Sequence, residues 1–209
     1  MSTLSAVILA GGRSSRMGLP KATLPFGSST IIERLVDTLR GPFTEIVVVA
    51  APLRDEPFSI DRILRNRTVD LIIERDDNAF EGPVGALRRG LARARGEIVF
   101  ACSCDLPLLR SDVASALCAT IEGEDAAIPQ IEGLPQPLCA AYRRERAALA
   151  LAAMEAAGEH RLTLIAERLN VRAIYETALR AIDPDLRSFL NLNTVEDYTR
   201  ALRLAGEAI

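Results

Sequence analysis

The sequence has no tryptophan, a single histidine and a single lysine. With His160 as the only histidine, and with no zinc-type spacing among the four cysteines, a zinc centre is excluded. The start of the chain lacks the basic segment of a signal peptide, and no apolar run approaches the ~20 residues that span a bilayer. We therefore expect a cytoplasmic protein whose thiols are reduced; the four cysteines are Cys102, Cys104, Cys118 and Cys139.

The sequence also lacks an excess of charge of either sign. It has 25 basic and 28 acidic residues among 209, a net charge of −3 and a pI of about 5.4. A mildly acidic chain is a poor partner for nucleic acid or for an anionic membrane surface, so neither is expected. The length suits one domain, and we expect residues 1–209 to form it.

Short β-rich runs alternate with segments of helical spacing along the whole chain. The expected strands are Leu4–Ala10, Glu45–Ala51, Val69–Glu74, Glu97–Cys102, Ala126–Gln130, Leu138–Tyr142 and Val171–Tyr175. The expected helices are Thr30–Leu39, Val84–Ala94, Asp112–Ile121, Arg144–Ala156 and Val195–Ala205. This alternation predicts an α/β fold with three layers, helices covering both faces of a sheet.

The first expected strands are apolar throughout, as in a parallel sheet that is buried on both faces. In open sheets of this kind, ligands bind beyond the carboxyl ends of the strands. The segment 122–137, rich in Gly, Pro and Glu, resembles an insertion with short strands that covers a cleft. The residues that follow each strand are therefore the candidates for function.

A glycine pair and three basic residues follow the first strand. Gly11 and Gly12 allow consecutive N–H groups to approach a ligand, and Arg13, Arg16 and Lys21 add positive charge. The spacing fits neither the Walker A loop nor the dinucleotide fingerprint. A polyphosphate site is favoured over a solvated basic turn, because the only lysine among 25 basic residues lies just beyond the glycines.

Two further strand ends carry polar residues. Asp105 precedes Leu106-Pro107 after the fourth strand, where it either holds a cation or caps a turn; Mg²⁺ prefers one or two carboxylates together with phosphate oxygens. Asn191 and Asn193 lie two apart on an extended segment and so point the same way. They are candidates for binding a cation, a phosphate or a sugar, and either Asn193 or Thr194 is a candidate N-cap of the last helix.

These segments resemble the molybdenum cofactor guanylyltransferase family, in the GT-A-like group of Rossmann-like nucleotidyltransferases. The matching segments are Leu9–Gly12, Arg16–Gly18 with Lys21, Gly82–Ala86, Cys104–Pro107, Gln136–Ala140 and Asn191–Asp197. Their order along the chain is that of the family. The resemblance implies a three-layer α/β/α fold with a mostly parallel central sheet.

The resemblance also implies roles for individual residues. Asp105 would bind Mg²⁺, Lys21 and Arg16 would offset charge on the leaving pyrophosphate, and Asn191 and Asn193 would lie near the metal or the acceptor phosphate. The implied nucleotide site consists of Leu9, Ala10, Gly11, Gly12, Lys21, Asp76 and Asp105.

The chain departs from the family at the residue that helps to read the base. The family usually has an aspartate after the third strand, where this chain has Arg75 followed by Asp76. We take Asp76 for that role. Where some members have asparagines after the second strand, this chain has Ala50-Ala51-Pro52.

The implied reaction transfers GMP from GTP to molybdopterin and releases pyrophosphate. The alternatives are a cytidylyltransferase that uses CTP on the same pterin, a sugar-phosphate nucleotidyltransferase, and a GTP-binding module without catalysis. The presence of Asp105 argues against the last. The resemblance also implies transient contacts with molybdenum cofactor synthesis proteins and apo-molybdoenzymes.

Overall fold

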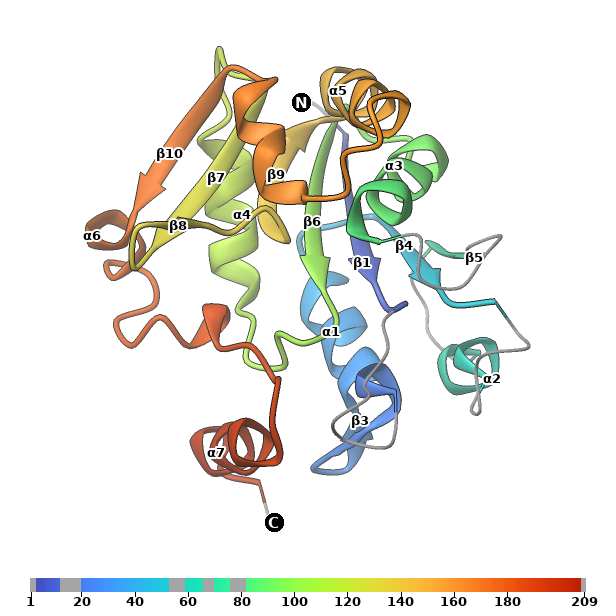
Figure 1. Cartoon of the computed structure of the whole chain (residues 1–209). Helices are drawn as coiled ribbons and strands as arrows, with labels where there is room; N and C mark the ends of the chain where they lie inside the picture. Colours follow the sequence, from blue (N-terminus) through green and yellow to red (C-terminus); the bar gives the residue numbers. More distant parts are fainter. Residues whose placement is uncertain (1–2, 12–19, 53–58, 66–69, 76–81, 208–209) are drawn as a thin grey trace.

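The computed structural model describes residues 3–11, 20–52, 59–65, 70–75 and 82–207. Within these ranges an eight-stranded sheet runs through the molecule in the order β10-β7-β9-β6-β1-β4-β5, with β8 paired to β7 (Figure 1). The strands are β1 Leu4–Leu9, β4 Glu45–Ala50, β5 Asp70–Arg75, β6 Ile98–Ser103, β7 Ala126–Ile131, β8 Leu134–Pro135, β9 Cys139–Arg143 and β10 Val171–Tyr175. A small hairpin joins β2, Pro25–Phe26, to β3, Ser29–Thr30.

Helices follow most of the strands. The α-helices are α1 Ile31–Leu39, α2 Ile60–Leu64, α3 Pro83–Arg93, α4 Ser111–Ala119, α5 Arg144–Ala156, α6 Glu176–Leu179 and α7 Val195–Ala205. The 3-10 helices are η1 Lys21–Thr23, η3 Leu162–Glu167 and η4 Arg187–Phe189. The expected bounds of three segments, 144–156, 171–175 and 195–205, agree with the structure to the residue.

The two faces of the sheet bury separate apolar clusters, which confirms the three layers. Along β1, Ala6 and Ile8 pack in the cluster that also contains side chains of α1, α4 and α7. Val7 and Leu9 point to the opposite face and pack in the cluster that contains side chains of α3 and α5. The alternation follows from the two-residue period of a strand.

The sheet is mostly parallel, as expected. β1 pairs in parallel with both β4 and β6, and β4 with β5. β9 runs antiparallel to both β6 and β7. The segment 122–137, expected to be an insertion, instead contributes β7 to the central sheet, although its last residues line a pocket described below.

Capping residues and a proline mark the first turns of α1, α3 and α7. Thr30 and Glu33 form a capping box at α1, and Thr194 and Asp197 form one at α7. Pro83 is the first residue of α3, as its sequence position predicts. Gly90 lets α3 approach the sheet closely, because a Cβ there would lie 2.5 Å from Cγ1 of Val7. Within the described ranges, no helix combines the length and apolar character needed to cross a membrane.

The buried carboxylate of Glu45 accepts hydrogen bonds from neighbouring segments at the amino end of the sheet. Glu45, 4% exposed, accepts hydrogen bonds from the backbone N–H and Nε of Arg95 at 2.8 and 2.6 Å and from the Ser5 hydroxyl. Burial by itself raises the pKa of Glu45, but these hydrogen bonds and the Arg95 charge outweigh burial and lower the pKa below its ordinary value of 4.5. The ionised carboxylate therefore stabilises the fold.

We predict that Glu45→Gln lowers the free energy of unfolding by about 1–3 kcal/mol at neutral pH, because ionised hydrogen bonds are lost. Since the folded pKa lies below the unfolded one, this contribution is present above pH 4.5 and disappears as the pH falls through the folded value. Urea unfolding at pH 7 and at lower pH measures the free energy of unfolding of Glu45→Gln and of the unaltered protein. The difference between the two proteins becomes smaller at acidic pH. Glu97→Gln, at an exposed ion pair with Arg143, serves as the control and changes stability by less than about 1 kcal/mol.

Candidate active site

The site lies where β1 and β6 end side by side. Leu9 is paired with Ser103 in the parallel register, and the Cys104 N–H donates to the Leu9 carbonyl at 2.9 Å. The chain therefore leaves the sheet at adjacent points, through exposed Gly11 on one strand and through Asp105 on the other. Parallel pairing thus brings together two segments that the sequence separates by nearly a hundred residues.

Lys21, which follows β1 in the sequence, lies beside Asp105 at this end of the sheet. It opens η1, whose backbone is tied by the Leu24 N–H to the Lys21 carbonyl at 3.2 Å. The Lys21 ammonium lies 3.5 Å from Oδ2 of Asp105 and donates to Oδ1 of Asn193 at 3.0 Å. The side chains of Lys21 and Asp105 are 19% and 20% exposed, so water screens their interaction only in part.

The asparagine segment is fixed to the same loop by its backbone. The Leu192 N–H donates to the Asp105 carbonyl at 2.9 Å, and the Leu192 side chain is fully buried. Its neighbours Asn191 and Asn193 are exposed, so burial alternates along this segment as in extended chain. The Asn193 N–H donates to Oδ2 of Asp197 at 3.0 Å, and this hydrogen bond is the main reason that the pKa of Asp197 is lowered.

A second buried connection supports the asparagines from upstream. Asp183, 2% exposed, accepts from the Ser188 N–H at 2.7 Å. The Ser188 hydroxyl in turn accepts from the Arg110 N–H at 3.1 Å, in the loop that follows Asp105. The segment 183–193 is therefore hydrogen-bonded to the loop after β6 at two points, Ser188 and Leu192.

Asp105 has one carboxylate oxygen to offer to a ligand. Its Oδ1 is buried, and no hydrogen-bond partner for it lies among the described residues. The adjacent Cys104 is no competitor, because burial, together with the Asp105 charge, raises the pKa of its thiol to about 12. In the described part of the chain no group of three or more His, Cys, Asp or Glu residues is arranged to hold a metal. Asp105 therefore fits a cation that takes its other ligands from phosphate and water, as Mg²⁺ does.

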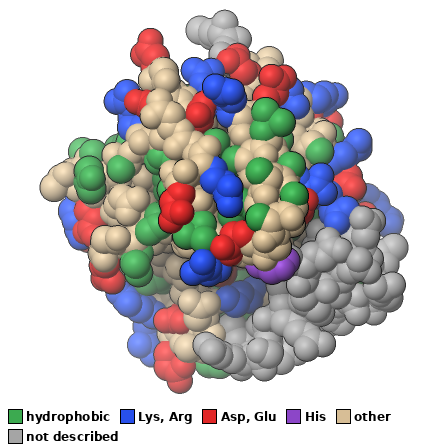
Figure 2. All heavy atoms as spheres, turned by 45° about the horizontal axis from the view of Figure 1, so that its top comes forward, with side chains coloured by type: hydrophobic (Ala, Val, Ile, Leu, Met, Phe, Trp, Pro, Cys, Tyr) green, Lys and Arg blue, Asp and Glu red, His purple; other side chains and the backbone are tan. Residues whose placement is uncertain are grey.

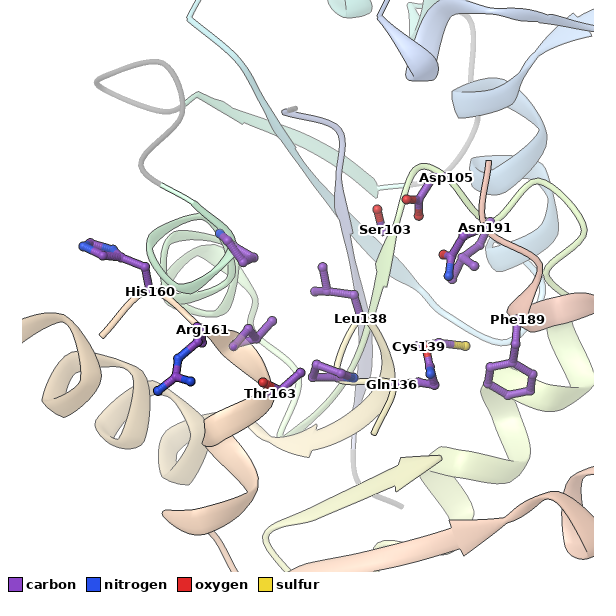
Figure 3. A pocket seen from close by; sticks show the side chains of 14 residues that line it. Ser103, Asp105, Gln136, Leu138, Cys139, His160, Arg161, Thr163, Phe189 and Asn191 are labelled. Carbon is purple, nitrogen blue, oxygen red and sulfur yellow. The ribbon is translucent and has the colours of Figure 1, made fainter. Parts of the chain in front are cut away.

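A pocket of about 380 Å³ adjoins Asp105 (Figure 3). Asp105 and Asn191 lie at one end, and His160 and Arg161 lie at the other. The remaining lining residues are Pro83, Ser103, Leu106, Gln136, Pro137, Leu138, Cys139, Leu162, Thr163 and Phe189. Its walls are formed by the end of β6, the first turn of α3, the loop before β9 and the start of η3.

Several lining residues were not recognised from the sequence. Gln136 and Cys139 lie in a segment that carried the resemblance but had no assigned role. His160 is exposed (Figure 2), and it also lines the pocket together with Thr163. The segment 160–163 has no motif, and only its exposed polar side chains after α5 distinguish it.

Other expected site residues are placed in part. Leu9 and Ala10 are buried at the end of β1, so they shape the site through the backbone. Gly12, Arg13, Arg16 and Asp76 lie outside the described residues. Arg75 donates to the Ala51 carbonyl at 2.8 Å and forms an ion pair with Asp61, so it ties the end of β5 to β4 and α2. Cys102 and Cys104 are buried free thiols in the apolar core.

The sequence of the chain is similar to that of known proteins. Residues 6–172 match the family model of the MobA-like NTP transferase domain. A probable molybdenum cofactor guanylyltransferase from Methanosarcina acetivorans is 33% identical over 198 residues, which cover 92% of this chain and 87% of the relative.

Two solved structures share the fold. Molybdopterin-guanine dinucleotide biosynthesis protein A from Archaeoglobus fulgidus superposes with a TM-score of 0.79 at 24% identity and covers 97% of this chain and 98% of its own. A Mycobacterium tuberculosis protein solved as a complex with manganese superposes with a TM-score of 0.65 at 17% identity and covers 97% and 99%. At these identities the structures show the fold alone.

We predict that Thr194→Ala lowers the free energy of unfolding by about 1 kcal/mol, because the capping box at the start of α7 is lost. Thr199→Ala is the matched control on the same helix, where the hydroxyl only donates to the Val195 carbonyl. Urea unfolding measures both variants. Equal stability of the two would show that the cap does not hold the asparagine segment.

Proposed function

The chain belongs to the MobA-like NTP transferase family, and we propose that it transfers GMP from GTP to molybdopterin with release of pyrophosphate. It is a nucleotidyltransferase. The observation that carries the proposal is the meeting of the Lys21 ammonium, the Asp105 carboxylate and the Asn193 amide at the carboxyl ends of β1 and β6. Three segments distant in sequence supply one cation, one anion and one neutral polar group.

The chemistry requires mainly positioning and neutralisation of charge. Attack of the acceptor's terminal phosphate on the α-phosphorus of GTP forms one P–O bond and breaks the bond to pyrophosphate. Lys21 is suited to bind phosphate oxygens as a rotatable point charge. The nucleotide phosphates are proposed to contact Arg16 and the backbone of Leu9, Ala10, Gly11 and Gly12. The base is proposed to contact Asp76.

A divalent cation is proposed as cofactor, with Mg²⁺ as the physiological ion. Asp105 would hold it through the buried oxygen that has no partner in the described structure. When bound, such an ion neutralises charge on the phosphate oxygens. The manganese complex of a structural neighbour supports a divalent ion in this fold.

We assign the pocket beside Asp105 to the acceptor. It is larger than a single phosphate requires, and its lining combines apolar side chains such as Leu138 and Phe189 with polar ones such as Gln136 and Thr163. That combination suits a heterocycle that carries hydrogen-bonding groups. Asn191, which lines the same end as Asp105, is proposed to bind the acceptor near its phosphate, and Asn193 is proposed to act beside it.

The enzyme is expected to act in the cytoplasm. There it would receive molybdopterin from molybdenum cofactor synthesis proteins and deliver the product to apo-molybdoenzymes, through transient contacts. The names of the curated relatives favour GTP over CTP as donor.

We predict that Lys21→Met and Asp105→Asn each lower turnover by about 10²–10³-fold, because each removes a fixed charge from the reacting phosphates. Release of pyrophosphate from GTP and molybdopterin measures turnover, and the same assay with CTP tests the base. Asp185→Asn, an exposed aspartate paired with Arg187, is the matched control and retains full activity. Near-normal turnover of either site variant in folded protein would overturn the assignment.

We further predict that Thr163→Phe raises the KM for molybdopterin about tenfold or more, because the larger side chain fills part of the pocket. The thermal shift caused by GTP with Mg²⁺ stays unchanged. Thr177→Phe, on the exposed surface of α6 and outside this pocket, leaves both quantities unchanged. If Thr163→Phe alters GTP binding and leaves the KM for molybdopterin unchanged, the pocket belongs to the nucleotide instead.

A further inference from the structure

Lys21 and a divalent cation require the same carboxylate. The Lys21 ammonium lies 3.5 Å from Oδ2 of Asp105, and the second oxygen of that carboxylate is the one available to a cation. A cation held there would lie within a few ångströms of the ammonium. Since both side chains are only about one-fifth exposed, solvent does not remove the repulsion between the two positive charges.

Asn193 keeps the ammonium at this place. Its amide oxygen accepts from Lys21 at 3.0 Å, and its own backbone N–H is anchored on Asp197. The amide brings no charge, so in the described structure Asp105 is the carboxylate that balances Lys21. The ammonium is therefore held against the metal-binding carboxylate by a neutral group.

We propose that Lys21 makes the binding of a divalent cation at Asp105 dependent on the triphosphate, with Asn193 as the positioning residue. This inference rests on the proposed function. A triphosphate offers anionic oxygens to the ammonium and further ligands to the cation, so attraction to the phosphates offsets the repulsion when all three are together. Without the nucleotide, the cation competes with the ammonium for one carboxylate. Cation and nucleotide then strengthen each other's binding, beyond the direct bond between them.

The test uses Mn²⁺ as the probe and the nucleotide-free protein. Electron paramagnetic resonance of free Mn²⁺ gives the affinity of each variant. Lys21→Met is expected to bind Mn²⁺ roughly tenfold more tightly than the unaltered protein, as expected from removing a unit charge near a divalent one. Asp105→Asn binds it more weakly, and Asn193→Ala shows a smaller gain than Lys21→Met. Equal Mn²⁺ affinities of Lys21→Met and the unaltered protein would overturn the proposal.

Two controls separate charge from shape. Lys21→Arg retains the charge and is expected to bind Mn²⁺ as the unaltered protein does. Arg146→Met removes one positive charge from an exposed ion pair with Asp125 and is expected to have no effect. A gain in Mn²⁺ affinity with Lys21→Arg as large as that with Lys21→Met would contradict the electrostatic cause.

The nucleotide half of the coupling is measured by equilibrium dialysis of GTP with and without Mn²⁺. The factor by which Mn²⁺ strengthens GTP binding is expected to be several-fold larger in the unaltered protein than in Lys21→Met. An equal factor in the two proteins overturns the proposed dependence. If GTP binds to neither protein while Lys21→Met still gains Mn²⁺ affinity, the competition at Asp105 stands and the proposed function fails.

Discussion

The parallel pairing of β1 with β6 is the constraint on which the site depends. It brings the Cys104 N–H within hydrogen-bonding distance of the Leu9 carbonyl, so Gly11 and Asp105 leave the sheet at adjacent points. Both strands are buried on two faces, so a one-residue shift of register would move the side chains of each cluster to the opposite face and disrupt the packing of both clusters. The core thus fixes the distance between Gly11 and Asp105.

The sequence predicted the elements that carry local signals. Segments 144–156, 171–175 and 195–205 have in the structure the bounds that their spacing predicts, and capping boxes of Thr30 with Glu33 and of Thr194 with Asp197 begin α1 and α7. The sequence did not predict the direction of β9 or the place of β7 in the main sheet, because strand pairing is decided by tertiary contacts. Lys21, Asp105 and Asn193 were predicted as candidates and lie together. The pocket wall at 160–163 was missed, because a 3-10 turn after a helix has no distinctive pattern.

Arginine and lysine occur in different roles in this chain, and the difference follows from the geometry of their side chains. Arginines supply exposed ion pairs such as those of Arg143 with Glu97 and Arg180 with Glu176, where a planar fork suits a carboxylate. Arg95 does the same for buried Glu45 at the other end of the sheet. The single lysine stands where one compact charge must serve either a carboxylate or a phosphate. A rotatable ammonium can exchange such partners more readily than a bidentate guanidinium.

Asp105 connects the proposed nucleotide half of the site to the proposed acceptor half. Its carboxylate faces Lys21, from the loop after β1, while its backbone carbonyl accepts from Leu192, between the two asparagines. A displacement of the segment 191–193 would therefore also move the Asp105 loop. The Asp105 carboxylate, which forms the ion pair with Lys21, would move with it. Because the pocket also ends at Asp105 and Asn191, an acceptor bound there contacts the same short loop. The two substrates of the proposed reaction thus meet at one residue that is fixed from both sides, which is the arrangement that transfer between two phosphates requires.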